Sequence, residues 1–349
     1  MILCAYVSGD ARGMRAVTAD DASRLDLINI AFGTLRDGLL WYPRIAETKV
    51  EIDRLRAVKP DLKILLSVGG WGAGGFSTMA KTPEGIAAFT ASCMEAADAM
   101  GLDGIDIDWE YPTIGSAGID HAPEDKENFT ALLASLREAL GPDRMLTIAA
   151  GAGKYMTDAV EIPKIVPLLD YISLMTYDMA GAWTPACHHT ALYPTGHPDV
   201  RNMCVDSTVK VFEEAGVPAE KLVIGAAFYS RRWTHIPAAD NLGFGEKCYD
   251  PNDKESGFWG PGYGEISKMA DPNAPESKGW IVVRDEKAHA RWLYNPEKEE
   301  FLSYDDEESV AEKVRYANDN SLLGVMYWEH GSDPTRKLLT AMAAAKKEL

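Results

Sequence analysis

Three carboxylates recur at alternate positions in one short stretch, residues 101–112. Because alternate side chains of an extended strand share a face, Asp106, Asp108 and Glu110 are predicted to point the same way. The interleaved residues are apolar and would point the other way: Ile105, Ile107 and Trp109. Neighbouring carboxylates would lie about 6.6 Å apart, which is close enough for their charges to interact in a site of low dielectric.

Grouping like charges on an apolar strand costs free energy, and such groups often mark a carboxyl that must hold a proton near neutral pH. The alternative is a solvated run of charge on a loop. The flanking Ile and Trp residues disfavour that alternative. The stretch therefore predicts a carboxyl group that works as a general acid or base.

Composition limits the possible partners. The chain has 349 residues, of which 46% are hydrophobic and 25% charged, as in an ordinary soluble globular protein. This length accommodates one large α/β barrel or two domains of ordinary size. The net charge of −18 argues against nucleic acid and against an anionic membrane as partners, whereas a neutral polar ligand remains possible.

The remaining sequence signals predict a simple protein without cofactors. The sequence has no apolar run of transmembrane length, and residues 1–7 lack the basic start and the cleavage site of a signal peptide. Five scattered cysteines lack metal-site spacing and are predicted to be reduced thiols. The pair His188-His189 has no third ligand at a suitable spacing. We therefore expect no cofactor, no metal, a monomer, and a cytoplasmic location, or a secreted one if a leader peptide has been removed.

Eight short apolar runs, most of them followed by a helical pattern, predict a parallel sheet built from βα units. The runs are Ile2 to Val7, Leu27 to Phe32, Ile64 to Val68, Gly104 to Trp109, Leu146 to Ala150, Tyr171 to Thr176, Leu222 to Phe228 and Gly324 to Trp328. The clearest predicted helix begins at Pro83, after the capping residue Thr82. Four further helices are predicted at Pro123 to Leu140, Asp206 to Ala215, Asp306 to Asn320 and Pro334 to Lys347. This pattern predicts the α/β class and a (β/α)8 TIM barrel.

One interval between predicted strands is too long for a simple connection. Residues 229–323 are rich in Gly, Pro, Trp and Tyr, and structureless loops of that length are uncommon. We predict a small α+β insertion domain at 231–300, with the barrel formed by 1–230 and 301–349. Its strand-like segments are Trp280 to Arg284 and Ala290 to Tyr294. Since the insertion follows a strand, it should lie beside the C-terminal face of the barrel, where barrel enzymes place their active sites.

Polar and aromatic residues follow several predicted strands and should meet at this face. They are Ser67 to Trp71 at the end of the third strand, Met175 to Asp178 at the end of the sixth, and Trp328-Glu329 at the end of the eighth. Carboxyls and a tyrosine hydroxyl over an apolar floor suit a sugar ring, which has flat apolar faces and hydroxyl edges.

These segments resemble glycoside hydrolase family 18, the chitinases and their relatives. The stretch from Asp103 to Glu110 matches the D-x-x-D-x-D-x-E signature of that family. Ser67 to Gly70 resembles its S-x-G-G motif, Met175 to Asp178 its M-x-Y-D motif, and Trp328 its tryptophan on the eighth strand. The resemblance spans nearly the whole chain and includes an insertion that is similar to the chitinase insertion domain.

The resemblance implies roles for four catalytic residues. Glu110 is expected to protonate the leaving glycosidic oxygen. The 2-acetamido group of the substrate acts as the nucleophile in this family, which departs from the scheme of two enzyme carboxylates. Asp108 would orient that acetamido group, Asp106 would share a proton with Asp108, and Tyr177 would hydrogen-bond the acetamido oxygen. Asp103 lies off the shared face and is expected to be structural.

The resemblance also implies residues that bind the sugar. Asp178 would contact it and Trp328 would form a stacking floor. The other expected cleft residues are Tyr6, Phe32, Trp71, Met175, Tyr229 and Arg231. Three further tryptophans could provide outer stacking platforms, although spacing does not place them: Trp183, Trp233 and Trp292.

The resemblance predicts a retaining hydrolase of β-1,4-linked N-acetylglucosamine chains, acting on chitin or chito-oligosaccharides through an oxazolinium intermediate. Two enzymatic alternatives are an endo-β-N-acetylglucosaminidase acting on N-glycans and a glucosaminidase acting on peptidoglycan. A third alternative is a non-catalytic, chitin-binding lectin. Loss of the acid is the usual mark of such lectins, and Glu110 is present here.

Overall fold

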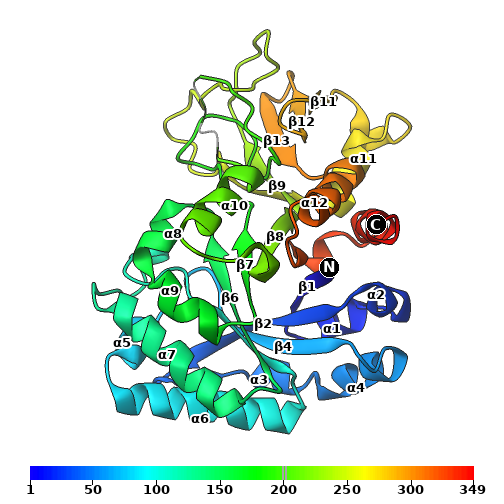
Figure 1. Cartoon of the computed structure of the whole chain (residues 1–349). Coiled ribbons are helices and arrows are strands. Elements are labelled where there is room, and N and C mark those ends of the chain that lie inside the picture. Colours follow the sequence, from blue (N-terminus) through cyan, green and yellow to red (C-terminus); the bar gives the residue numbers. More distant parts are fainter. Residues whose placement is uncertain (199, 201–202) are drawn as a thin grey trace.

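The chain folds around a closed barrel of eight parallel strands in the computed structural model, which describes residues 1–198, 200 and 203–349 (Figure 1). The barrel strands are β1 (Ile2–Ser8), β2 (Leu27–Arg36), β4 (Lys63–Gly69), β5 (Gly104–Asp108), β6 (Met145–Gly151), β7 (Tyr171–Met175), β8 (Leu222–Ala227) and β14 (Gly324–Trp328). Strand β1 pairs in parallel with both β14 and β2, which closes the barrel. All eight predicted strands and the TIM barrel are confirmed.

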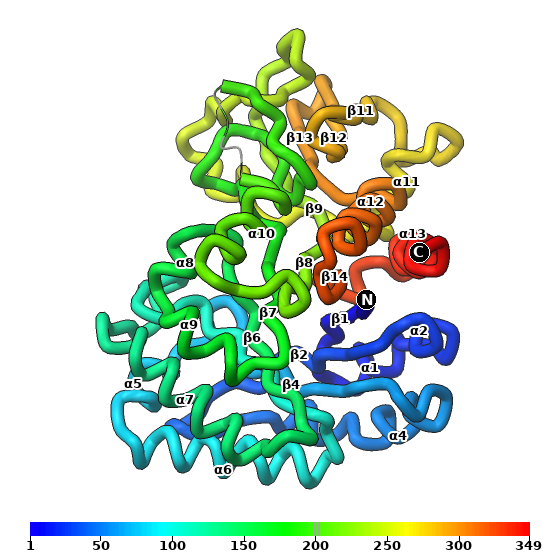
Figure 2. Tube along the Cα trace, in the orientation of Figure 1, coloured from blue at the N-terminus to red at the C-terminus, as the bar shows by residue number. Residues whose placement is uncertain are grey.

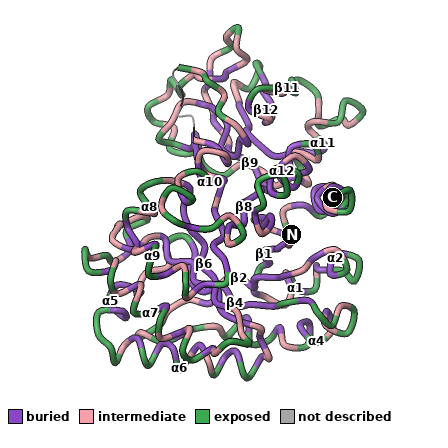
Figure 3. Tube along the Cα trace, viewed as in Figure 1, coloured by how far each residue is buried: buried purple, intermediate pink, exposed green. Residues whose placement is uncertain are grey.

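Helices surround the strands on the outside of the barrel (Figure 2). They are α1 (Ala11–Ala16), α2 (Ala19–Arg24), α3 (Pro43–Ala46), α4 (Lys49–Val58), α5 (Phe76–Ala80), α6 (Pro83–Met100), α7 (Asp125–Leu140), α8 (Lys154–Ala159), α9 (Ile162–Ile165), α10 (Val205–Glu214), α12 (Glu307–Asp319) and α13 (Lys337–Lys347). Figure 3 shows buried and exposed residues alternating along them, as expected for helices with one face against a core. Within the described residues, no helix has both the length and the apolar character required to cross a bilayer.

Helix α6 illustrates how local sequence sets these boundaries. The side chain of Thr82 caps its first turn by accepting a hydrogen bond from the Gly85 N–H, and Pro83 occupies the first helical position. The helix ends at Gly101, whose φ of 65° is a left-handed conformation that glycine adopts without strain. Its apolar side chains recur at helical spacing and are buried in the core, among them Phe89, Cys93 and Ala97.

A second, antiparallel sheet lies between β8 and β14 in the sequence. Its order is β10 (Phe258–Gly262), β9 (Tyr229–Trp233), β13 (Glu300–Tyr304), β12 (Ala290–Asn295) and β11 (Ile281–Asp285). Together with α11 (Tyr263–Ala270), it forms the upper part of the molecule in Figure 1. The two predicted strand segments correspond to β11 and β12. The sheet extends slightly beyond 231–300 at both ends, and the domain boundary itself stays a prediction.

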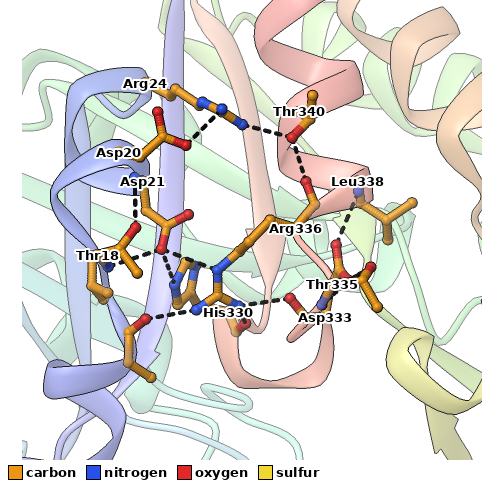
Figure 4. Close-up of polar contacts among 12 residues, drawn as sticks. Thr18, Asp20, Asp21, Arg24, His330, Asp333, Thr335, Arg336, Leu338 and Thr340 are labelled. Atoms are coloured by element: carbon orange, nitrogen blue, oxygen red, sulfur yellow. Dashed lines mark hydrogen bonds and ion pairs between the residues drawn. The ribbon is translucent and has the colours of Figure 1, made fainter.

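A polar cluster joins α2 to the segment that follows β14, close to both ends of the chain (Figure 4). Asp21 is buried at its centre and accepts hydrogen bonds from Arg336 Nε, at 3.0 Å, and from the Thr18 N–H. His330 Nε2 lies 3.4 Å from the same carboxylate. Arg336 also donates to the Ala16 carbonyl, so the cluster ties the first and the last βα units together.

The Asp21 cluster should contribute to stability. Burial raises the pKa of Asp21, but hydrogen bonds from His330 and Thr18 outweigh it and hold the pKa well below its ordinary value. Asp21→Asn should lower the free energy of unfolding by about 1–3 kcal/mol, because the partly buried guanidinium of Arg336 loses its charged acceptor. This difference from wild type should shrink as pH falls below about 4, where the unfolded chain takes up the proton. Urea unfolding at several pH values measures both effects.

Asp20 provides the control in the same helix. It pairs with Arg24 at the surface, and its side chain is 67% exposed. Asp20→Asn should change stability by less than about 1 kcal/mol. Equal effects of the two substitutions would contradict a special role for Asp21.

Candidate active site

Asp106 lies inside the barrel and anchors the predicted carboxylate column. It is fully buried and accepts hydrogen bonds from Tyr6 Oη at 2.9 Å, from Ser67 Oγ at 2.7 Å, and from Thr147 Oγ1 at 2.6 Å. These donors come from β1, β4 and β6, so one carboxyl group links four strands. Burial raises the pKa of Asp106, and the three hydrogen bonds oppose that rise.

Asp108 follows at the end of β5 and lines the cavity at the mouth of the barrel. Burial raises its pKa well above the ordinary value, and the charges of Glu110 and Asp106 raise it further. Among the described residues, its Oδ1 atom has no hydrogen-bond partner. Its backbone carbonyl accepts from the Gly70 N–H at 2.8 Å. The S-x-G-G segment thus supports both aspartates, because Ser67 holds Asp106 and Gly70 holds the backbone of Asp108.

Glu110 lies two residues beyond Asp108 on the same side of the chain. Its side chain lines the cavity and is 8% exposed. Burial raises its pKa to about 7, and the negative charge of Asp178 contributes to this shift, whereas Tyr111 opposes it. A carboxyl with this pKa is about half protonated at pH 7, so much of the protein can donate this proton to a bound ligand.

Tyr177 and Asp178 follow β7 and face the same cavity. Asp178 accepts a hydrogen bond from Arg231 Nε at 2.7 Å, and His189 Nδ1 lies 3.5 Å from the same carboxylate oxygen. Burial raises the pKa of Asp178, but its bonds with His189 and Arg231 outweigh burial and lower the pKa to about 2. Asp178 is therefore charged at neutral pH, whereas Glu110 carries its proton in a large fraction of the molecules. The site holds an acid and a fixed anion together.

Aromatic side chains form the floor of the site. The Trp328 ring stacks on Phe32, with centroids 5.2 Å apart and planes 16° apart, and lies 5.7 Å from the Tyr6 ring. Phe32 also packs against Gly70, where a Cβ atom would approach the Phe32 ring to 2.6 Å. Glycine is required at this position because the ring occupies the space of a side chain.

The cavity has a volume of about 830 Å³, which is in the range of small-molecule sites. It brings together eleven of the twelve predicted site residues: Tyr6, Phe32, Trp71, Asp108, Glu110, Met175, Tyr177, Asp178, Tyr229, Arg231 and Trp328. The twelfth, Asp106, lies behind Asp108. Asp103 lies at the other end of β5 and pairs with Arg56 and Lys63, as expected for a structural residue.

Of the three tryptophans that sequence spacing did not place, one lines the cavity and two are buried in the core of the insertion. Trp183 lines the cavity with 61% of its surface exposed, and Arg231 lies over its ring. Trp233 and Trp292 belong instead to a buried apolar cluster beneath the second sheet. They are core residues of the insertion and are not exposed stacking platforms.

Several cavity residues were missed by sequence reasoning. Tyr111 and Tyr155 form one wall, with ring centroids 5.4 Å apart. Phe258 and Trp259 reach the cavity from β10, and both are more than half exposed. The Gly- and Trp-rich segment 257–264 was visible in the sequence, but which of its side chains turn toward the barrel depends on how the second sheet packs.

Comparisons with known proteins agree with this geometry. The family model for glycosyl hydrolases family 18 matches residues 3–333. Chitinase A1 of Niallia circulans is 34% identical over 323 residues, which cover 88% of this chain and 46% of that protein. Chitinase B of Serratia marcescens is 28% identical, with 91% of this chain and 75% of that protein covered.

A solved structure is similar over its whole length. It is a family 18 N-acetylglucosaminidase from Paenibacillus barengoltzii, which is 41% identical, covers 99% of both chains, and gives a TM-score of 0.90. This match includes the barrel and the second sheet, and the family model covers nearly the whole chain. The chain therefore belongs to glycoside hydrolase family 18.

Proposed function

We propose that this protein is a retaining glycosidase that hydrolyses β-1,4-linked N-acetylglucosamine chains, either chitin or chito-oligosaccharides. The proposal rests on two carboxyl groups at the barrel mouth that ionise differently. Glu110 is buried with its pKa raised to about 7, and Asp178 is held as an anion. The relatives named chitinases support the choice of substrate. The chain spans about half the length of the first of them, so the assignment concerns this chain alone.

In the proposed reaction, Glu110 gives its proton to the glycosidic oxygen as the bond from that oxygen to the anomeric carbon breaks. The acetamido oxygen of the sugar forms a bond to the same carbon, giving an oxazolinium ion. A water molecule then attacks this carbon as its bond to the acetamido oxygen breaks, which restores the acetamido group, and the water gives a proton back to Glu110. Two inversions at one carbon retain its configuration.

Three residues around Glu110 support substrate assistance. Asp108 has an Oδ1 atom without a partner among the described residues, and that atom is available to accept the acetamido N–H. Tyr177 lines the cavity, and the acceptor nearest its hydroxyl among the described residues is the weak Met326 Sδ at 3.7 Å, so the hydroxyl is available to donate to the acetamido oxygen. Asp106, fixed by its three donors, would share a proton with Asp108 as charge develops on the sugar.

A second candidate function is exo-acting release of single N-acetylglucosamine units. The full-length similarity to a family 18 N-acetylglucosaminidase favours it. Both candidates use the same acid and the same acetamido chemistry. They differ in how much of the sugar chain the cavity must accept on either side of the cleaved bond. Retention of Glu110, Asp108 and Tyr177 argues against a non-catalytic lectin.

Product analysis tests the proposal and separates the candidates. Defined N-acetylglucosamine oligomers should be cleaved, and the product masses should show dimers and trimers for an endo-acting enzyme or successive monomers for an exo-acting enzyme. A fully deacetylated oligomer should remain intact, because it lacks the nucleophile. Cleavage of an N-glycopeptide in place of the oligomers would overturn the substrate assignment, and cleavage of the deacetylated oligomer would overturn the mechanism.

Glu110→Gln removes the acid while preserving the shape of the side chain. The turnover of a chromogenic chitobioside should fall about 10²- to 10⁴-fold, with little change in the affinity for an oligosaccharide measured by calorimetry. Asp103→Asn, at the opposite end of the same strand, is the control and should leave kcat unchanged. Turnover by Glu110→Gln at the wild-type rate would exclude Glu110 as the acid.

The pKa of Glu110 predicts an alkaline limit to activity. Because burial raises this pKa from 4.5 to about 7, the acid stays protonated well above the range of an exposed glutamate. We expect kcat/KM to fall about tenfold per pH unit above about pH 7. Trp71→Ala should raise KM without moving this limit, because Trp71 carries no titratable group. A fall already complete at pH 5 would contradict the raised pKa.

A further inference from the structure

A set of three potential metal ligands lies away from the active site, in the segment that connects β9 to β10. His235, Cys248 and Asp253 place a ring nitrogen, a thiol sulfur and a carboxylate oxygen within 4.8 Å of one another. Of the described residues, these are the one group of three His, Cys, Asp or Glu side chains arranged in this way. Their spacing in the sequence gave no signal, since the ligands come from three separate turns.

The three turns are tied together by hydrogen bonds that do not involve the ligand atoms. The Tyr249 N–H donates to the His235 carbonyl at 3.1 Å, which places Cys248 beside His235. The Ser256 hydroxyl donates to the Thr234 carbonyl, and the Thr234 N–H donates back to that hydroxyl, both at 3.1 Å. The backbone therefore holds the ligands close together before any ion binds.

Asp253 is fixed in the orientation that a metal would require. Its Oδ1 atom accepts from the N–H groups of Glu255 and Ser256, at 2.9 and 3.1 Å. Its Oδ2 atom accepts from Thr234 and lies 2.8 Å from His235 Nδ1. A cation can replace the proton between these two atoms, since imidazole and carboxylate ligands of one zinc ion lie about 3 Å apart when each bond is about 2.0–2.2 Å long.

Cys248 differs from the other cysteines of the chain. It is partly exposed, whereas Cys4, Cys93, Cys187 and Cys204 are buried in apolar surroundings. Its sulfur lies 3.4 Å from the Asp250 carbonyl, at the edge of the apolar cluster that contains Trp233 and Trp292. Cys248 is therefore the one cysteine among the described residues whose thiol solvent and an ion can readily reach.

We propose that His235, Cys248 and Asp253 form a binding site for a divalent cation of borderline softness, of which Zn²⁺ is the best match. Zinc accepts a nitrogen, a sulfur and a carboxylate oxygen ligand in tetrahedral geometry, with water as the fourth, whereas a thiolate and an imidazole are unsuited to Mg²⁺ or Ca²⁺. Binding releases the thiol proton of Cys248 and leaves His235 neutral, with its proton on Nε2. The side chain of His235 is 43% exposed, so an ion can enter from solvent.

Such an ion would stabilise a long irregular connection. Residues 234–257 contain no helix or strand, and they lead directly into Phe258 and Trp259, which line the catalytic cavity. Arg231 Nη1 donates to the Gly257 carbonyl at 3.2 Å, so the end of this connection also contacts the residue that holds Asp178. His235, Cys248 and Asp253 do not themselves line the catalytic cavity, so the site would be structural.

Metal titration of the full chain, first stripped with a chelator, tests this proposal. Co²⁺ should bind with one equivalent per chain and produce a thiolate-to-cobalt charge-transfer absorption, and Zn²⁺ should displace it. Cys248→Ser should abolish that absorption, and both Cys248→Ser and His235→Gln should weaken Zn²⁺ binding at least about tenfold. His289→Gln is the matched control, because His289 has a similar exposure of 37% and also lies beside a carboxylate. Retained glycosidase activity shows that each variant is folded.

A second measurement needs no variant. A thiol reagent should label Cys248 first in the native chain, and saturating Zn²⁺ should slow that labelling at least about tenfold. Labelling that Zn²⁺ does not change, or Zn²⁺ affinity that is equal in wild type and Cys248→Ser, would overturn the proposal. Neither result depends on the substrate of the enzyme.

Discussion

The site depends on one buried carboxyl group, Asp106. It has no access to solvent, yet Tyr6, Ser67 and Thr147 each donate a hydrogen bond to it. A carboxyl in such a place is tolerated because its oxygens are satisfied, and its donors are held in place in return. This arrangement fixes the position of β5 relative to its neighbours, and therefore the position of Asp108 and Glu110 beyond it.

A second buried charge fixes the other side of the cavity. Asp305 accepts hydrogen bonds from Lys313 Nζ at 2.5 Å and from the Ala227 N–H at 2.9 Å. Lys313 also donates to Thr190, whose hydroxyl donates to the carbonyl of Thr176. Since Tyr177 follows Thr176 and Tyr229 lies two residues beyond Ala227, this network holds the ends of β7 and β8 together. Removing one partner would leave an unpaired buried charge, which explains why the two charges occur as a pair.

The fold was largely predictable because the barrel depends on local patterns. Each apolar run buried on both faces became a strand, and Thr82-Pro83 marked the start of α6. The carboxylate column was predictable for a similar reason, because strand alternation places Asp106 and Asp108 on one face, and Glu110, just past the end of β5, lines the same cavity as Asp108. Trp233 and Trp292 could not be assigned in this way, since their burial depends on how the second sheet packs. The pairing of Asp178 with Arg231 and His189 also joins residues that no local pattern connects.

The pKa values of Glu110 and Asp178 differ because their neighbours differ, and not because one of them is more deeply buried. Both carboxyls line the same cavity, and burial raises the pKa of each. Asp178 has Arg231 and His189 beside it, so its charged form is stabilised, whereas the nearby Asp178 anion disfavours ionisation of Glu110. Arg231 thereby acts on the acid indirectly: by keeping Asp178 ionised, it helps Glu110 to keep its proton. An arginine on β9, the first strand of the insertion sheet, thus contributes to the acid strength of a residue beyond β5, which couples the second sheet to the chemistry of the barrel.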